Sequence, residues 1–533
     1  MFCPKCRQSY GSEDLERLVP NQSNIGYDVL NFVGKSYHQK SKSHISIQKE
    51  LNQCNVFLSL REIGYLAKKF IIYLSIAHRE AAESLRRQMV SRGGYILHLD
   101  GTIGKKGNSP FLISALDGLT GMVLGNAKVS SESLANITPF LELIKGRFGD
   151  PIALVHDMGH GLTSAVDHVF PHTPDFICHF HFLRDLGKDL MKTQYQVLSK
   201  DVKALRVRTK LREASRKLKL MIEADPHEKA CLDRCLDKIP TMERGISMKV
   251  STYLLLMWVL ECSASLKGYG LPFDRADMVF FHRLQDASPM IRRWLFTQKN
   301  KGSLSRLGYL LKSITNDQRL NGLIAGLDQK ARDFDSLRNA MKIALPDGSA
   351  GLNDDGDTDE SLSTIRLRVN DWLQQPHIHK LAVNDRRYEK AIKQINKYEH
   401  RLFADPIQVE TSEGVIEIRP QRTNNILERF FRDLKRISRK RNGFISVGSE
   451  IRTMVSDTPL VKNLENPEYL KVILGGRNNL AERFSEIDPK KVRDLLNKHQ
   501  DELCPGSVKL RRLAKIEDLP ALLEDLTAAE RVA

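Results

Sequence analysis

The sequence predicts an α/β fold in which a sheet-forming core is interrupted by a long all-helical segment. Three observations support this prediction. Short apolar runs with strand character alternate with helical patterns between residues 95 and 181. Helical periodicity alone continues from 183 to 399, and one more helix with a core-facing stripe begins near Thr423. The length of 533 residues also exceeds that of one ordinary domain, so two to four domains are expected.

The alternating region predicts five strands and two helices. A strand at Tyr95–Asp100 comes first, and the turn DGLTG at Asp117–Gly121 predicts a hairpin between the next two strands. The remaining expected elements are strands at Pro110–Leu116 and Gly121–Val129, a helix at Ser133–Phe148, a strand at Ile152–Asp157, a helix from about Leu162 and a strand at Asp175–His181. Three antiparallel strands followed by helix, strand, helix and strand is the order of a ribonuclease H-like core.

The same patterns divide the chain into five regions. Residues 1–90 form an N-terminal region with a candidate DNA-binding or zinc element, and residues 91–190 the first part of the core. Residues 191–400 form the all-helical insertion, with an acidic loop at 346–363 that we expect to be mobile. Residues 401–488 complete the core, and residues 489–533 form a helical C-terminal tail.

Composition restricts the class of protein. Apolar residues make up 41% of the chain and charged residues 28%, which is typical of a soluble globular protein. The longest apolar run, Tyr253–Leu260, is interrupted by Glu261 and is too short for a membrane span, so no membrane partner is expected. The N-terminus has no signal-peptide pattern, and eight scattered cysteines favour a reducing compartment. We therefore expect a cytoplasmic protein, associated with the nucleoid if bacterial.

The net charge of +17 predicts a polyanionic partner, with nucleic acid as the first choice. Basic residues cluster in two segments: Lys203–Lys219 carries eight against one acid, and Arg422–Gly443 carries eight against two. Such clusters fit a surface that follows phosphates better than a uniformly solvated one.

A cysteine pair stands close to the N-terminus. Cys3 and Cys6, in CPKC, have the spacing of half a zinc ribbon. A second pair does not follow, and Cys54, His38 and His44 would complete a site only with irregular spacing. A zinc site and an ordinary pair of reduced thiols both remain open.

Three carboxylates are candidates for the chemistry. Asp100 and Asp157 end two apolar strands, and the C-terminal ends of strands are where α/β folds place reactive groups. The alternative for Asp100 is a turn, because Asp-Gly is a common turn pair. Glu428 lies beside the apolar stripe of the helix at 423–443. Its alternative is a capping box with Asn425, in which the glutamate only binds a free amide.

Four segments together resemble the DDE/D transposases of the Mutator-like type and their bacterial insertion-sequence relatives. They are HLDGT at His98–Thr102, VHDMGHGLTSAV at Val155–Val166, CHFHFLRDLGKDL at Cys178–Leu190 and TNNILERFFRDLKRISRKRNG at Thr423–Gly443. The resemblance covers residues 95–190 and 423–443, and the helical block between them fits the family's habit of inserting an all-helical domain.

The resemblance implies that Asp100, Asp157 and Glu428 are the catalytic acids and bind two Mg²⁺ or Mn²⁺ ions. It also implies a structural or end-recognition role for Cys178 and His181, the C-x-x-H motif expected on the strand after Asp157. Zinc at that motif would need two further ligands that the sequence does not identify.

The implied function is DNA transposition: hydrolysis of phosphodiesters at the ends of a mobile element, then recombination by strand transfer of the 3′-hydroxyl into target DNA. A homodimer or higher oligomer on DNA is expected, because two ends must be joined. The alternatives are a ribonuclease H-like nuclease without strand transfer and a domesticated DNA-binding protein. Basic residues of the 423–443 helix would follow phosphates beside the cut site, or would form only a solvated helix face. They are Arg432, Lys435, Arg436, Arg439, Lys440 and Arg441.

Overall fold

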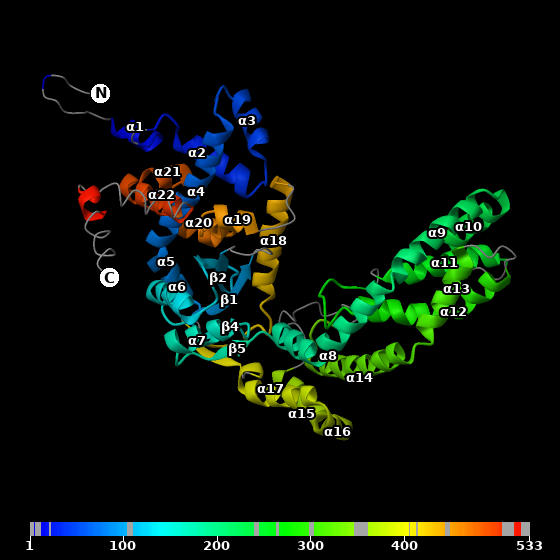
Figure 1. Ribbon diagram of the computed structural model, residues 1–533. Coiled ribbons are helices and arrows are strands. Elements are labelled where there is room, and N and C mark those ends of the chain that lie inside the picture. The colour runs from blue at the N-terminus through cyan, green and yellow to red at the C-terminus, as the bar shows by residue number, and fades with distance from the viewer. Residues whose placement is uncertain are drawn as a thin grey trace. The chain divides into compact units, whose positions relative to one another are not determined.

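The computed structural model forms two compact units. One unit comprises Met1–Cys178 and Ala404–Ala533, and the other comprises His179–Phe403 (Figure 1). The residues that the structure describes are 5, 12–20, 23–103, 110–238, 245–262, 266–297, 303–345, 361–403, 406–411, 414–442, 448–503, 516 and 518–523. Most of the predicted acidic loop at 346–363 lies outside these ranges, as do Cys3 and Cys6.

A five-stranded mixed sheet forms the centre of the first unit, with strand order β3-β2-β1-β4-β5. The strands are β1 (Ile96–Ile103), β2 (Phe111–Asp117), β3 (Val123–Val129), β4 (Ala153–His156) and β5 (Asp175–Ile177). The first three strands pair antiparallel, whereas β4 pairs parallel with both β1 and β5. The helices α6 (Leu134–Phe148) and α7 (His160–Val169) make the two crossovers. The predicted α/β class is confirmed, and the hairpin and the order of strands and helices along the chain agree with the prediction.

The last predicted strand was wrong at its C-terminal end. We expected a strand to His181, but β5 ends at Ile177 and helix α8 (His179–Ala204) begins two residues later. The five residues from His179 to Leu183 are all buried. A short run that is buried on every side looks the same in sequence whether it is a strand or the start of a buried helix. Cys178 therefore lies between the two elements, and His181 lies in the first turns of α8.

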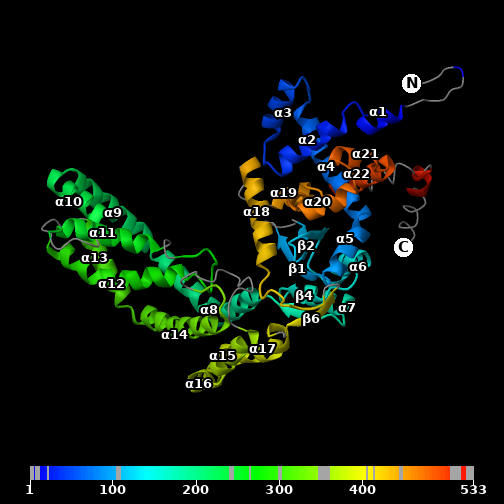
Figure 2. The same cartoon turned by 180° about the vertical axis from the view of Figure 1, so that it is seen from behind.

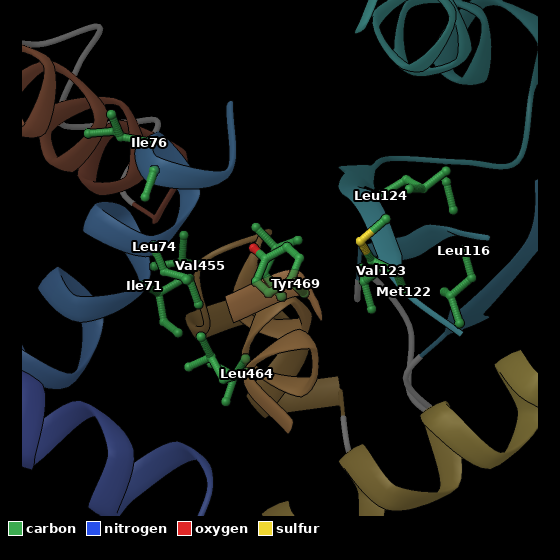
Figure 3. Close-up of a cluster of buried hydrophobic side chains, with 14 of the residues drawn as sticks. Ile71, Leu74, Ile76, Leu116, Met122, Val123, Leu124, Val455, Leu464 and Tyr469 are labelled. Atoms are coloured by element: carbon green, nitrogen blue, oxygen red, sulfur yellow. The ribbon is translucent and has the colours of Figure 1, made fainter. Parts of the chain in front are cut away.

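Helices from both ends of the chain pack around the sheet. Helix α4 (Leu60–Glu80) begins with a capping box in which Ser59 and Glu62 bond each other's backbone amides. Figure 3 shows Ile71, Leu74 and Ile76 of α4 in one buried cluster with side chains of β2, β3 and the C-terminal region. The other helices of this unit are α1 (Glu13–Leu18), α2 (Tyr27–His38), α3 (His44–Gln53), α5 (Ala82–Ser91), α18 (Asn425–Asn442), α19 (Gly448–Thr453), η3 (Thr458–Glu465), α20 (Pro467–Leu474), α21 (Leu480–Ser485) and α22 (Pro489–Leu503).

Two short strands that the sequence analysis missed complete this unit. Strands β6 (Ile407–Thr411) and β7 (Gly414–Ile418) form a hairpin. Ile418 of this hairpin packs against Ile96 of β1 and against Ala153 and Val155 of β4. The hairpin thus covers one face of the main sheet near the N-terminal ends of β1 and β4. The chain enters helix α18 shortly after the hairpin.

The described part of the second unit is all helical. Helix α8 packs against α14 and α17, while α9, α11, α12 and α13 pack against one another. The helices after α8 are α9 (Val207–Glu223), α10 (Pro226–Lys238), α11 (Met248–Leu260), α12 (Ala276–Thr297), α13 (Ser303–Thr315), α14 (Gln318–Met341), α15 (Leu362–Leu373), α16 (Pro376–Asn384) and α17 (Arg386–Leu402). Within the ranges described, none of the helices is both long and apolar enough to cross a membrane.

Buried histidines make stability dependent on pH. His78 of α4 places Nε2 3.0 Å from the carbonyl of Leu124 and Nδ1 3.1 Å from the hydroxyl of Tyr469. Burial lowers the pKa of His78 to about 4. The unfolded chain, with a histidine pKa of about 6.5, therefore binds more protons than the folded chain between these two values. Folding stability from this residue is present above about pH 6.5 and is lost as the pH falls toward 4.

We expect the free energy of unfolding to decrease when the pH is lowered from 7 to 4.5, with His78 contributing roughly 1 to 3 kcal/mol of the decrease. Urea denaturation at several pH values, for the natural chain and for His78→Gln, measures this contribution. The variant should show a shallower pH dependence, whatever its stability at pH 7. An unchanged slope would show that His78 does not titrate with unfolding.

Candidate active site

Asp100 lies inside strand β1 rather than in a turn. It pairs with Ser114 of β2, and the antiparallel pairing continues to Ile103. Gly101 fits here because a Cβ atom at this position would lie 1.9 Å from the ring of Phe111. The turn alternative for this Asp-Gly pair is therefore excluded. The side chain is largely buried, and its Oδ1 accepts a 2.7 Å hydrogen bond from the amide of Gly101.

Asp157 follows β4 at a position that corresponds to Asp100 on β1. The register of this parallel pair runs from Ile96 opposite Ala153 to His98 opposite Val155. Continuing the same register by two residues brings Asp157 level with Asp100. Asp100 and Asp157 therefore stand at matching positions along the two neighbouring chain segments, with Asp157 one residue beyond the end of β4.

Hydrogen bonds hold the chain around Asp157. Its Oδ1 accepts a 3.0 Å bond from the amide of Gly159, and its carbonyl oxygen lies 2.6 Å from Nδ1 of His156. Nε2 of the fully buried His156 lies 3.1 Å from the carboxylate of Asp175 on β5. His156 thus ties the turn that carries Asp157 to the neighbouring strand. The partner of His156 could not be identified from the sequence, because Asp175 comes 19 residues later.

Helix α18 is anchored to β1 through Asn424. The amide nitrogen Nδ2 donates a 2.6 Å bond to the carbonyl of Leu99, and Oδ1 lies 2.8 Å from Nδ1 of His98. The backbone amide of Asn424 donates to Sγ of Cys178 at 3.2 Å. Asn424 and His98 are fully buried, and Cys178 nearly so. Three segments far apart in the sequence therefore meet at one point beside Asp100.

Burial fixes the protonation state of His98, where β1, Cys178 and the start of α18 meet. It lowers the pKa of His98 to about 4, against the opposing effect of the bond to Asn424. The neutral imidazole can then donate its Nδ1 proton to Oδ1 of Asn424, while the carbonyl of Leu99 accepts from Nδ2. Every polar atom of the Asn424 side chain has a directional partner, which sets the position of the first turn of α18.

Glu428 lies four residues after Asn424, one helical turn along α18. The backbone of Glu428 is described, but its side chain is not. Because α18 begins at Asn425, Asn424 occupies the N-cap position and Leu427 the third helical position. Glu428 falls one residue beyond the place that a capping box requires. Helix α18 runs beside β1 and β2 in both views, and it contacts β1 (Figures 1 and 2).

Glu132 is a further carboxylate near Asp157 that the sequence analysis did not single out. It lies between β3 and α6, in the polar stretch SSES, which looks like an ordinary helix start. A Cβ atom built on Gly159 would lie 2.4 Å from Oε1 of Glu132 and 3.1 Å from Oδ1 of Asp157. Loss of hydration around the carboxyl group and the charge of Asp157 raise the pKa of Glu132 to about 7, although the residue as a whole remains exposed.

Most of the basic side chains predicted to contact DNA form the outer face of α18. Arg432, Lys435, Arg436, Arg439 and Lys440 are all exposed. Arg441 differs, because its side chain is 2% exposed, forms a 2.8 Å ion pair with Glu450 and lies over the ring of Tyr37. Its charge is already neutralised within the fold, so the open basic face consists of the other five residues.

The C-x-x-H motif is divided between the two units. Cys178 ends the first stretch of the first unit, where its sulfur binds Asn424, and His181 lies in α8 of the second unit. Burial lowers the pKa of His181 to about 3, and the charges of Arg184 and Lys188 act in the same direction. The expectation that both residues lie on one strand was therefore wrong. The structure shows Cys178 as a buried hydrogen-bond acceptor for the Asn424 amide.

The described donors fit a hard cation better than zinc. Asp100 and Asp157 both offer carboxylate oxygens, and such oxygens are the ligands that Mg²⁺ and Mn²⁺ prefer. Among the residues with described side chains, no three or more His, Cys, Asp and Glu residues are grouped closely enough to hold a metal ion. Glu428, which would supply the third carboxylate, is not among those side chains.

The comparisons with known proteins give one family. Residues 115–238 match the family described as "Transposase, Mutator family". The match extends from β2 to α10 and includes Glu132, Asp157, Cys178 and His181, and it confirms the resemblance found in the sequence motifs. The search of curated proteins found no match.

Proposed function

We propose that this chain, which carries the transposase segment of the Mutator family at residues 115–238, is a DNA transposase of the DDE type. It would hydrolyse phosphodiesters at the ends of a mobile element and then join the new 3′-hydroxyl to target DNA. The observation that supports this most strongly is the parallel register of β1 and β4, which brings Asp157 level with Asp100 when it is continued by two residues. A helix with a third acid is anchored to the same strand.

We further propose that the first unit has a ribonuclease H-like core and that the second unit is an insertion into it. The strand order β3-β2-β1-β4-β5, with three antiparallel strands followed by two parallel ones, supports this fold. Both boundaries of the helical unit fall inside the core sequence, between β5 and β6.

The face of β1 that carries Asp100 shows how the third acid could reach the site. On this face Ile96 packs under the β6–β7 hairpin, His98 binds Asn424, and Asp100 comes next. Two residues along a strand advance about 6.6 Å. One turn of α18, from Asn424 to Glu428, advances about 5.4 to 6 Å. Asp100 therefore lies about as far along β1 from His98 as Glu428 lies along α18 from Asn424, and His98 and Asn424 are bonded to each other.

Asp100, Asp157 and Glu428 would hold two Mg²⁺ or Mn²⁺ ions. When bound, such ions stabilise the attacking and leaving oxygens of an in-line phosphoryl transfer. The protein's own contribution is to fix the carboxylates. The amides of Gly101 and Gly159 orient one oxygen of each aspartate, His156 holds the backbone of Asp157, and Asn424 places the helix of Glu428. Holding these groups in place before the reaction removes the cost of arranging them during it.

A strand-transfer assay with paired element ends tests the proposal. We expect metal-dependent cleavage at the ends, joined product with target DNA, and assembly of a dimer or higher oligomer on the paired ends. Cleavage without joining would replace the transposase with a ribonuclease H-like nuclease. Binding without cleavage would indicate a DNA-binding protein that has lost activity.

The exposed face of α18 should determine phosphate contact and therefore salt sensitivity. Replacing Arg432 and Lys435 with alanine should weaken DNA binding by about tenfold or more at low salt. It should also reduce the slope of log affinity against log salt by about two. The charge-matched control replaces Lys471 and Lys490, which are exposed elsewhere on the same unit. Fluorescence anisotropy at several salt concentrations measures both slopes. Equal slopes of log affinity against log salt for the two double variants would show that the α18 face is an ordinary solvated surface.

A further inference from the structure

We propose that a cavity beside β3, the edge strand of the main sheet, binds a phosphate group. This cavity, called the β3 pocket here, has a volume of about 350 Å³ and is lined by residues of α4, β3, α6, α22 and the segment 455–457. All of these elements belong to the first unit. Neither Asp100 nor Asp157 lines the pocket, and no residue of α18 with a described side chain does. The inference therefore does not depend on the proposed catalytic acids.

Two arginine side chains lie close together at this pocket without an acid for each. Arg79 of α4 donates a 3.0 Å hydrogen bond to the carboxylate of Asp457, which also accepts from the hydroxyl of Ser75. Arg147 of α6 is partly buried, and its guanidinium forms no ion pair or hydrogen bond with the groups that the structure describes. Burial lowers the pKa of Arg147, and the charge of Arg79 lowers it further against the opposing effect of Asp457. The two guanidinium groups therefore repel each other, and an anion bound beside both would remove the repulsion.

Strand β3 supplies hydrogen-bond donors that the fold leaves partly unused. Asn126 is 8% exposed, and its Oδ1 accepts a 2.7 Å bond from Ser114, whereas its Nδ2 has no partner in the described part of the chain. Buried polar groups are almost always bonded, so an unbonded amide at a cavity is a site for an external acceptor. Lys128 lies two residues further along β3, on the same face as Asn126. Its Nζ donates to the carbonyls of Arg452 and Met454, and an ammonium group has a third N–H to offer.

The charge balance of the β3 pocket favours an anion. Burial lowers the pKa of Lys128 to about 8, so most of this group is still protonated at pH 7. His499 stays neutral, because burial and the charges of Lys128 and Lys68 lower its pKa to about 4. Four cations and two carboxylates in the lining leave a net charge of +2. These groups are Arg79, Lys128, Arg147 and Lys498 against Asp457 and Glu502.

A phosphate group matches these donors. Its oxygens accept from several N–H groups at once, and a guanidinium offers paired N–H donors in a planar fork that fits them. The cavity volume lies in the range of small-molecule sites, about 300 to 1,000 Å³, so it has room for inorganic phosphate or a mononucleotide. The exposed side chains of Arg79 and Lys498 open the pocket to solvent, so a phosphate of a DNA backbone can also reach it. Both sources share the phosphate chemistry.

Isothermal titration calorimetry of the full-length chain without DNA tests the site, with inorganic phosphate and adenosine monophosphate as probes. We expect Arg147→Gln to weaken binding of the probes by about tenfold or more. The matched control is Arg87→Gln, which removes an exposed arginine from α5 of the same unit and should bind the probes like the natural chain. Lys498→Gln, at an exposed position of α22, should weaken binding by about two- to fivefold and serves if Arg147→Gln does not fold.

Fluorescence anisotropy with a DNA duplex of arbitrary sequence identifies the source of the phosphate. If a backbone phosphate occupies the pocket, Arg147→Gln should reduce the slope of log affinity against log salt by about one relative to Arg87→Gln. The duplex should then also displace the small probes. If a small molecule occupies the pocket, the two slopes should be equal and the probes should bind with the duplex present.

Agreement between Arg147→Gln and Arg87→Gln in both the calorimetry and the salt slopes would overturn the phosphate site. Neither measurement involves cleavage, so that result would leave the proposed function standing. Conversely, loss of the proposed function in a strand-transfer assay would leave probe binding at the β3 pocket unchanged.

Discussion

Replacing Asp157 with asparagine is expected to lower DNA cleavage by on the order of a thousandfold, which corresponds to about 4 kcal/mol of activation free energy. Asparagine keeps the shape of the side chain and an oxygen that can accept from the amide of Gly159, so the local fold should survive. The negative charge that would hold a divalent ion is lost. Asp100→Asn and Glu428→Gln should have comparable effects for the same reason.

DNA binding should remain within a few-fold of the natural chain in these variants, because phosphate contacts come from the exposed residues of α18. Asp185→Asn is the matched control. Asp185 lies on α8, is partly exposed and forms ion pairs with nearby Arg184 and Lys188. Its loss should leave cleavage unchanged. Cleavage at the natural rate by any of the three acid variants would remove that residue from the catalytic set.

Replacing Asn424 with alanine is expected to destabilise the first unit by about 2 to 4 kcal/mol and to reduce cleavage as well. The variant leaves the carbonyl of Leu99 and Nδ1 of His98 buried without their partners. The first turn of α18 also loses its attachment to β1. Because Glu428 lies one turn further on, a small shift of the helix should reduce cleavage by about ten- to a hundredfold.

Urea denaturation and a cleavage assay measure the two effects in the same preparation. The control is Asn384→Ala, which removes a side-chain bond of 2.9 Å to the carbonyl of Lys380 at an exposed site. This control should cost well under 1 kcal/mol. If Asn424→Ala unfolds at the same urea concentration as the natural chain, the junction does not hold the helix.

The sequence predicted the sheet well because its signals are local. The apolar runs, the turn at Asp117–Gly121 and the amphipathic α6 each depend on neighbours within about 20 residues. Asp117 illustrates this: it was interpreted as a turn residue, and it bonds Leu119 and Thr120 within the turn and pairs with Arg92. The prediction failed at His179–Leu183, where complete burial removes the periodicity that distinguishes strand from helix.

The junction around Asn424 could not be predicted because it joins Asn424 to residues that lie 246 to 326 positions away in the sequence. The residue types alone, an asparagine at a helix start and a histidine in a strand, are more often a cap and a core residue. The burial of Arg441 could not be predicted from the sequence for a similar reason. In the sequence it is one of six similar basic residues, and only the contacts with Tyr37 and Glu450 distinguish it.

Glu132 shows a different limit of prediction from the sequence. Its environment depends on Gly159 and Gly161 after β4, which stand in the motif VHDMGHGLTSAV. Glycines at 159 and 161, combined with an acid in the preceding connection, could have suggested a close approach of two loops. The same local pattern also fits an ordinary turn, so only the folded structure distinguishes an ordinary turn from a close approach of two loops.

The most direct test of the account is a crystal structure of the chain with element-end DNA and Mn²⁺, with the ions located by anomalous scattering. The account predicts two anomalous peaks about 3.5 to 4 Å apart, contacted by oxygens of Asp100, Asp157 and Glu428. A structure in which the Glu428 carboxylate lies outside coordination distance of ions held by the two aspartates would contradict it.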